Sequence, residues 1–237
     1  MIRRIFLLGF VILCGTGNAA FADGPKPVQL GLFSPIQLVA ARDPIYGLRV
    51  NLIFTNDDNE VAGLSLSSGW TRTGSNMTGL QLGVVDWVDG SSFGWEAGLL
   101  NYTGDRFVGS GIGLVNIVKG DLTGVQLGAF NFDHGFVHGA QLGAINNVSE
   151  GFIGYQDGLL NMIKDNFSGF QTGAVNHVEG VMTGLQIGVF NYSRGVSGVQ
   201  IGAINMTDSL KGLQIGLVNY NGDSENIPFM VLLNCNF

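Results

Sequence analysis

One eight-residue phrase recurs along most of this chain and limits what the chain can fold into. Residues 124–131 read G-V-Q-L-G-A-F-N, and residues 139–146 read G-A-Q-L-G-A-I-N. The opening glycine recurs seven times at a step of fifteen residues and then twice at a step of fourteen. It stands at Gly79, Gly94, Gly109, Gly124, Gly139, Gly154, Gly169, Gly184, Gly198 and Gly212. Such a fixed period indicates a repeat architecture, in which each unit packs on its neighbours along the chain.

We number the positions of each repeat from the opening glycine, which is slot 0. Slots 1 and 3 are mostly apolar and flank Gln at slot 2, while slots 6 and 8 are mostly apolar and flank Asn at slot 7. Another apolar residue stands two positions before the next opening glycine, and slot 4 is Gly in all ten copies. A break in apolar alternation at a glycine indicates a corner. We therefore expect slots 1, 3, 6, 8 and 13 to point inward and Gln and Asn to point outward.

This pattern predicts an all-β fold, a single-chain parallel β-solenoid of about 15-residue three-sided coils with irregular caps. Stacked coils place identical residues above one another, so that Gln and Asn amides hydrogen-bond along the axis. That stacking explains why the same residue types keep the same slots.

An antiparallel outer-membrane β-barrel is the alternative interpretation of the same period. In that fold each repeat is an eleven-residue strand plus a turn, and the alternating C-terminal segment from Phe229 to Phe237 is typical of barrel proteins. A barrel strand presents one uniformly apolar face to lipid. Neither face of the hypothetical strand is uniformly apolar, because Gln and Gly interrupt one face and Asn interrupts the other. This composition favours the solenoid.

The sequence divides into four regions. Residues 1–22 read as a secretory signal peptide, with Arg3 and Arg4 before a short apolar run and small residues Ala20 and Ala22 before the cleavage point. Residues 23–78 are an N-terminal cap with degenerate repeats, 79–225 the regular repeat array, and 226–237 a C-terminal capping strand. A lipoprotein signal at Cys14 is disfavoured because Leu13, rather than a small residue, precedes it.

Composition narrows the function classes. The formal net charge is −7 and only 12% of residues are charged, which argues against nucleic-acid binding because phosphate contacts need clustered Lys and Arg. After cleavage only Cys235 remains of the two cysteines, so we expect no internal disulfide.

Three segments, GLQIGVFN, GVQIGAIN and GLQIGLVN, resemble the tandem G-L-Q-x-G-x-x-N copies of a bacterial family of surface repeat-containing proteins. The upstream segments VQLGLFSPIQL and YGLRVNLIF also resemble the lead-in of that family, so the resemblance covers Val28 to Asn219. It implies an exported, surface-associated protein. The family is of uncharacterised function, and the resemblance therefore carries no catalytic, cofactor or ligand residue to this chain.

The histidines are weak candidates for chemistry. His134 and His138 are four residues apart, which would suggest a metal pair on a helix, but here they flank a corner. His177 stands in slot 8 and is expected as an accommodated core residue.

Acidic residues offer two further candidates. Asp157 stands in slot 3, expected inward, where a carboxylate is out of place, and it indicates either a local bulge or a pocket with Thr172 of the next coil. Acidic corner residues form a candidate cation-binding ridge, although basic residues interrupt it. The acidic residues are Asp105, Asp121, Glu150, Asp165 and Glu179, and the basic ones are Lys119, Lys164, Arg106 and Arg194.

No catalytic motif or phosphate loop stands out in the sequence. The expected function is therefore a non-enzymatic, exported surface scaffold of adhesin-like type, without cofactor or metal. Its partner is a protein or glycan at the cell surface, with end-to-end self-association or outer-membrane association as further options. An outer-membrane barrel or pore is the alternative function, and an enzyme or ice-binding protein is less favoured because the outward slots lack rows of Thr.

Overall fold

The computed structural model describes residues 24–224 and 227–236, and within them every regular element is a β-strand. The expected signal peptide, residues 1–22, lies outside the described residues. The chain divides into two compact units, Met1–Tyr102 and Thr103–Phe237, and we describe each by itself. The first nine strands are β1 (Lys26–Phe33), β2 (Ile36–Gln37), β3 (Ile45–Asp57), β4 (Val61–Ser67), β5 (Trp70–Thr73), β6 (Met77–Leu82), β7 (Val85–Val88), β8 (Ser92–Ala97) and β9 (Leu100–Thr103). The others are β10 (Phe107–Ile112), β11 (Val115–Val118), β12 (Leu122–Leu127), β13 (Phe130–Asp133), β14 (Val137–Leu142), β15 (Ile145–Val148), β16 (Phe152–Ile163), β17 (Phe167–Asn221) and β18 (Phe229–Asn236).

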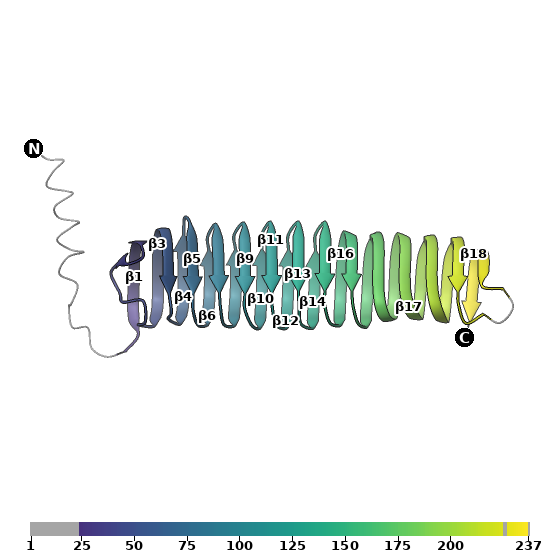
Figure 1. Ribbon diagram of the computed structural model, residues 1–237, viewed down its shortest axis with the longest axis horizontal. Helices are drawn as coiled ribbons and strands as arrows, with labels where there is room; N and C mark the ends of the chain where they lie inside the picture. Colours follow the sequence, from purple (N-terminus) through teal and green to yellow (C-terminus); the bar gives the residue numbers. More distant parts are fainter. Residues whose placement is uncertain (1–23, 225–226, 237) are drawn as a thin grey trace, which may run out of the picture. The chain divides into compact units, whose positions relative to one another are not determined.

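Strands one repeat apart pair in parallel, and this makes each unit a β-solenoid. In the C-terminal unit β12 pairs with β14 so that Gln126 lies opposite Gln141, and β13 pairs with β15 so that Asn131 lies opposite Asn146. In the N-terminal unit β4 pairs in parallel with β6, and β6 with β8. Within each unit, Figure 1 shows the successive coils side by side. The stacked solenoid of about 15-residue coils is confirmed, and the barrel alternative is wrong, because an antiparallel barrel requires neighbours that run in opposite directions.

Each regular coil contains two strand segments. The longer has six residues, as in β12, and the shorter has four, as in β13. One turn joins them at slots 4 and 5, and a second turn at slots 10 to 12 leads into the next coil. The expected division into three sides of five residues is therefore replaced by a coil with two strand segments and two turns.

The inside and outside of the coil are the reverse of the sequence expectation at six slots, 1, 2, 3, 6, 7 and 8. Gln at slot 2 and Asn at slot 7 are buried, as Gln141 and Asn146 show with no exposed surface. The apolar residues beside them point outward, and Phe130 at slot 6 is 37% exposed. The physical reason is the phase of the strand. Slot 13 and the following slot 2 are four residues apart in one continuous strand, so their side chains share a face.

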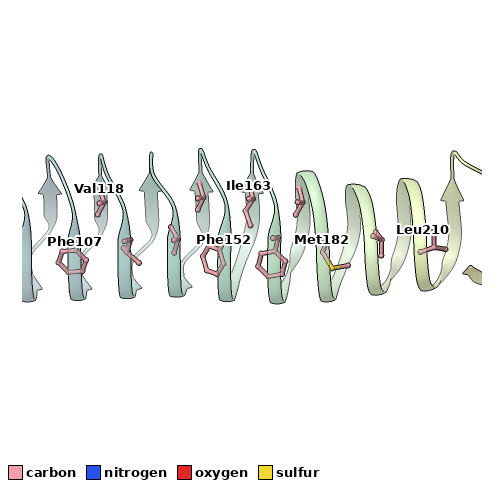
Figure 2. Close-up of a cluster of buried hydrophobic side chains, with 12 residues drawn as sticks. Phe107, Val118, Phe152, Ile163, Met182 and Leu210 are labelled. Carbon is pink, nitrogen blue, oxygen red and sulfur yellow. The ribbon is translucent and has the colours of Figure 1, made fainter. Parts of the chain in front are cut away.

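Two rows of apolar side chains complete the interior of the C-terminal unit. The position two before the next opening glycine, which is slot 13 in a 15-residue coil, is buried as expected and supplies the row from Phe107 through Phe152 and Met182 to Leu210. Slot 9 supplies the second row, which includes Val118 and Ile163 and was not expected. Figure 2 shows both rows pointing into the coils. Apolar and amide side chains thus share one narrow core.

The opening glycine is required by close approach between coils. Its φ lies between 119° and 152° in all the regular copies, a region that side chains rarely adopt. A Cβ atom added to Gly139 would lie 1.8 Å from the carbonyl oxygen of Gly124 in the preceding coil. Glycine therefore lets the long strand keep its ladder without a clash along the axis, and it does so within a strand rather than at a corner.

The first and last described strands are arranged differently from the coils. β1 pairs in parallel with β3 and antiparallel with β2. β18 runs antiparallel along the last coil of β17, with Asn234 opposite Gln214 and Met230 opposite Asn219. The C-terminal segment, expected as a capping strand, therefore reverses the chain direction of the stack.

Deleting one coil tests the modular stacking. Removing Gly154–Ser168 joins Ile153 to Gly169 and brings Gln141 beneath Gln171, with both amide ladders intact. We expect a folded chain that melts cooperatively, because each coil contacts only its neighbours. The control is removal of Gly154–Asn161 alone, which shifts the slots and should unfold the C-terminal unit. Circular dichroism melts measure both, and equal unfolding of the two variants would contradict the stacking.

Candidate functional site

The buried amides form two continuous ladders along the C-terminal unit. From Gln141 to Gln214, each Gln donates its Nε2 to the Oε1 of the Gln in the preceding coil, at 2.9 Å from Gln156 to Gln141 and 2.7 Å from Gln171 to Gln156. Each Asn donates its Nδ2 to the Oδ1 of the Asn in the following coil, at 2.8 Å from Asn146 to Asn161. The dipoles of the two ladders therefore point in opposite directions along the axis. Because both ladders are buried, they are not the repetitive polar face that the sequence suggested.

From Asn116 to Asn205, each ladder asparagine also holds the first turn of the following coil. The second hydrogen on Nδ2 of Asn146 is donated to the carbonyl oxygen of Asp157, and that of Asn161 to the carbonyl oxygen of Thr172, at 2.8 and 2.7 Å. These carbonyls stand at slot 3, where the strand enters the first turn. Glycine at slot 4 makes room for the bond, since a Cβ atom on Gly158 would lie 2.7 Å from Nδ2 of Asn146.

Two buried aspartates accept hydrogen bonds where a Gln has no Gln in the preceding coil. Slot 2 is Gly111 in the coil before Gln126, and Nε2 of Gln126 instead donates to Asp133 at 3.2 Å. Asp133 also accepts a hydrogen bond from Gln141. Slot 2 is Ser65 in the coil before Gln81, and Nε2 of Gln81 donates to Asp86 at 3.0 Å. The carboxyl groups of Asp133 and Asp86, buried inside the coils, therefore accept the hydrogen bonds that a Gln of the preceding coil does not.

Burial shifts the pKa values of these groups. Desolvation raises the pKa of Asp86 to about 6, against the opposing effects of the Gln81 hydrogen bond and the Arg49 charge. Desolvation likewise raises the pKa of Asp133 well above its ordinary value, although Gln126 and Gln141 donate to it. Burial thus makes ionisation of both carboxyl groups less favourable in the folded chain than in water.

The N-terminal unit contains a buried cationic group as well. Arg49 has no exposed surface, and its Nε donates to the Ser65 hydroxyl at 2.9 Å. Burial lowers its pKa to about 10, despite the favourable charges of Asp57 and Asp86. Desolvation raises the pKa of Asp57, which accepts a hydrogen bond from Gln37 at 2.9 Å. Sequence reasoning did not single out this group. The sequence did indicate it, since Arg49 occupies the Gln slot of a degenerate copy and Asp86 occupies the Asn slot of the first regular copy.

The structure separates the sequence candidates instead of gathering them. His134 lies at a turn 3.1 Å from Nζ of Lys119, while His177 points outward and stacks on Tyr192 with ring centroids 4.9 Å apart. His177 is therefore not the core residue that we expected. Asp157 also lies on the outer surface, where its Oδ1 accepts a hydrogen bond from Thr172 at 2.6 Å. The pairing with Thr172 is as expected, and the inward position is wrong.

The outer surface of the C-terminal unit is apolar along one turn and charged along the other. We name as the apolar stripe the exposed residues of slots 3, 5 and 6 in this unit. They are Ile112, Leu114, Leu127, Phe130, Leu159, Ile187, Val189, Ile204, Ile215, Leu217 and Val218. Exposed charged residues gather at the second turn, which includes the acidic and basic corner residues predicted from the sequence, such as Asp121, Glu150 and Lys164. The stripe was missed because slots 3 and 6 were assigned to the core and slot 5 to a corner.

The same slots line a shallow groove in the N-terminal unit. The groove has a volume of about 460 Å³ and is lined mainly by Val50, Leu52, Leu66, Leu82 and Val84. Apolar side chains at the first turn are thus exposed in both units.

Comparisons with known proteins do not assign this chain to a family. No protein-family model, curated protein or solved structure matches the chain. Within residues 24–224 and 227–236, no three His, Cys, Asp or Glu side chains are grouped as metal ligands. The described residues include no helix long and apolar enough to cross a membrane.

Adjacent asparagines at 146 and 147 test the inside–outside assignment. Asn146 is buried in the ladder and makes three hydrogen bonds, whereas Asn147 stands at slot 8 and points outward. We expect Asn146→Leu to lower the free energy of unfolding by about 3–5 kcal/mol, because it leaves buried partners unsatisfied. Asn147→Leu should change it by less than about 0.5 kcal/mol. Denaturant titrations compare the two variants, and a larger loss at position 147 would show the assignment to be wrong.

Substitution of Asp86 tests the raised pKa. A carboxyl group whose pKa is about 6 when folded and 3.8 when unfolded stabilises the folded chain at low pH. That contribution is lost as pH rises from about 4 through 6, by about 2–3 kcal/mol in total. Asp86→Asn keeps the acceptor for Gln81 and removes the ionisation. We therefore expect the variant to be more stable than the original chain at pH 7 and no more stable at pH 4.

Denaturant titrations between pH 4 and 8 measure this difference. Asp165→Asn, at an exposed turn, is the matched control and should leave the pH dependence unchanged. A variant Asp86→Asn whose stability follows the same pH curve as the original chain would contradict the role of Asp86.

Proposed function

We propose that this chain is an exported, non-enzymatic surface scaffold that binds a protein partner through the apolar stripe. The observation that carries the proposal is the separation of the exposed side chains of the C-terminal unit. Leu114, Leu159, Val189 and Leu217, all at slot 5, are between 53% and 68% exposed. The exposed charges gather at the other turn of the same coils, and the sequence of residues 1–22 supports export.

The size of the stripe supports a binding role. Eight coils open between Gly109 and Gly212, and at about 4.8 Å per coil they extend the stripe over roughly 35 Å. Its eleven side chains expose on the order of 1,000 Å², whereas the largest apolar patch on a typical monomer is about 300–600 Å². An exposed apolar surface of this size marks a site of interaction.

The chemistry of the stripe favours a protein partner over a glycan. The stripe presents aliphatic side chains and one phenylalanine, while a glycan is recognised chiefly through hydroxyl groups. Protein interfaces are apolar at their centre, and the composition of the stripe matches such a centre.

The positions of the ionisable groups support a non-enzymatic role. The carboxyl groups with shifted pKa values, Asp57, Asp86 and Asp133, are buried in the lumen, as is Arg49. Each of the three carboxyl groups accepts a hydrogen bond from a Gln amide, and Arg49 donates to the Ser65 hydroxyl. Groups that a substrate cannot reach serve the structure.

Site-specific photo-crosslinking tests the proposal. A photoreactive amino acid replaces Leu159 in the stripe, and the chain is expressed in cells that normally produce it. We expect one recurrent protein adduct, identified by mass spectrometry, because a specific partner buries this position. The matched control places the same amino acid at Lys164, five residues later at the charged turn, where the adduct should be weak or absent.

A second substitution tests whether the stripe itself carries the binding. Val189→Asp introduces a charge into the stripe two coils away, and it should reduce the adduct at position 159 at least tenfold while the chain stays folded. Equal adducts from positions 159 and 164, or an adduct unaffected by Val189→Asp, would overturn the proposal.

A further inference from the structure

The last strand of the chain leaves an unusual surface at the end of the C-terminal unit. β18 pairs with β17, and the structure shows no second strand beside it among the described residues. Its other edge therefore presents backbone N–H and C=O groups that can pair with another strand. β1, by comparison, pairs with both β3 and β2.

The side chains of this end are apolar and exposed. Six large apolar residues between positions 227 and 233 are 39–74% exposed. They are Ile227, Phe229, Met230, Val231, Leu232 and Leu233. No charged residue occurs between positions 227 and 236. Natural edge strands are commonly protected by lysine or another charge, and this strand has none.

The direction of β18 determines which partner fits its edge. The coils of the stack are parallel, so a stack extended through parallel coils would remain open at its end and continue into a filament. β18 reverses the chain direction and lies antiparallel to the last coil. Two copies of β18 can pair antiparallel across a two-fold axis, and such contact is self-complementary and closed.

We propose that two copies of this chain join end to end through an antiparallel pairing of their β18 strands. The six apolar side chains expose roughly 600–700 Å² per copy, so complete burial in the pair would remove about 1,200–1,400 Å² from water, the lower range of a specific interface. Backbone hydrogen bonds between the strands add to this burial. The uncharged sequence places no like charges opposite each other. The proposal is independent of the function assigned to the apolar stripe.

The interior of the unit already ends at this strand. Asn234 is the buried residue of β18, and its Nδ2 donates to Oε1 of Gln214 at 3.0 Å, which completes the Gln ladder. Nδ2 of the last ladder asparagine, Asn219, donates to the carbonyl oxygen of Gly216 within its own coil. The amide ladders are thus closed inside one copy. The outward residues of β18 are left for contact between copies.

Sedimentation equilibrium of the purified chain between 1 and 100 µM measures the association. We expect a monomer–dimer equilibrium without higher species. Val231→Lys places like charges on both strands and should raise the dissociation constant at least a hundredfold. The matched control, Leu159→Lys in the apolar stripe, should leave the constant within twofold. A monomer at every concentration, open-ended assembly, or loss of the dimer only in Leu159→Lys would overturn the proposal.

Single cysteines give a second measurement that does not depend on the Val231→Lys variant folding. In a Cys235→Ser background, cysteine is placed singly at positions 229, 231 and 233 of β18. Across a two-fold axis, only a residue near the axis faces its own copy, so one of the three should form the disulfide-linked dimer much faster than the others. Equal rates at all three positions, or no linkage at any, would contradict the antiparallel pairing.

Discussion

The hydrogen bond between identical buried amides in successive coils is the interaction on which the rest of the structure depends. A buried primary amide is costly unless its donors and acceptor are all paired. In this chain Asn161 accepts from Asn146 and donates both to Asn176 and to the carbonyl of Thr172. Such pairing is met only when neighbouring coils carry the same residue in the same register. The ladder therefore specifies the repeat length, the parallel stacking and the register together.

The interruptions of the ladder show how strictly this requirement applies. Where Gly111 supplies no acceptor for Gln126, Asp133 replaces an aliphatic residue of slot 9 and accepts instead. In the other unit Asp86, which stands in the Asn slot, accepts from Gln81 in the same way. Each carboxyl group satisfies an amide at the cost of its own desolvation, which is the cause of both raised pKa values. The acids of the lumen are thus consequences of the amide network.

The repeat period and the fixed slots were sufficient to predict an all-β solenoid of parallel coils, because few other folds require identical residues at one interval. They were not sufficient to distinguish inside from outside. An apolar-polar-apolar triplet buries either its centre or its flanks, and the usual preference for apolar cores selected the flanks. The alternation of side chains along the strand does distinguish them, because slot 13 and the following slot 2 lie four residues apart and therefore share a face. A buried Phe152 therefore implies a buried Gln156. The same error concealed the apolar stripe, because Leu127 and Phe130 were assigned to the core.

The two surfaces of the coil are free to change to different degrees. Inside, slots 2 and 7 must match the coils above and below, and they hold Gln and Asn in most of the regular copies. Outside, slot 1 holds Trp95, Ser110, Ala140 and Tyr155 in successive or nearby copies, because an outward residue needs no identical neighbour. A core held by amide hydrogen bonds does not require every apolar side chain to be buried, so those beside the ladder remain available on the surface. The fold can keep its register while its outer slots vary, and the outer surface is consequently where selection for a partner can act.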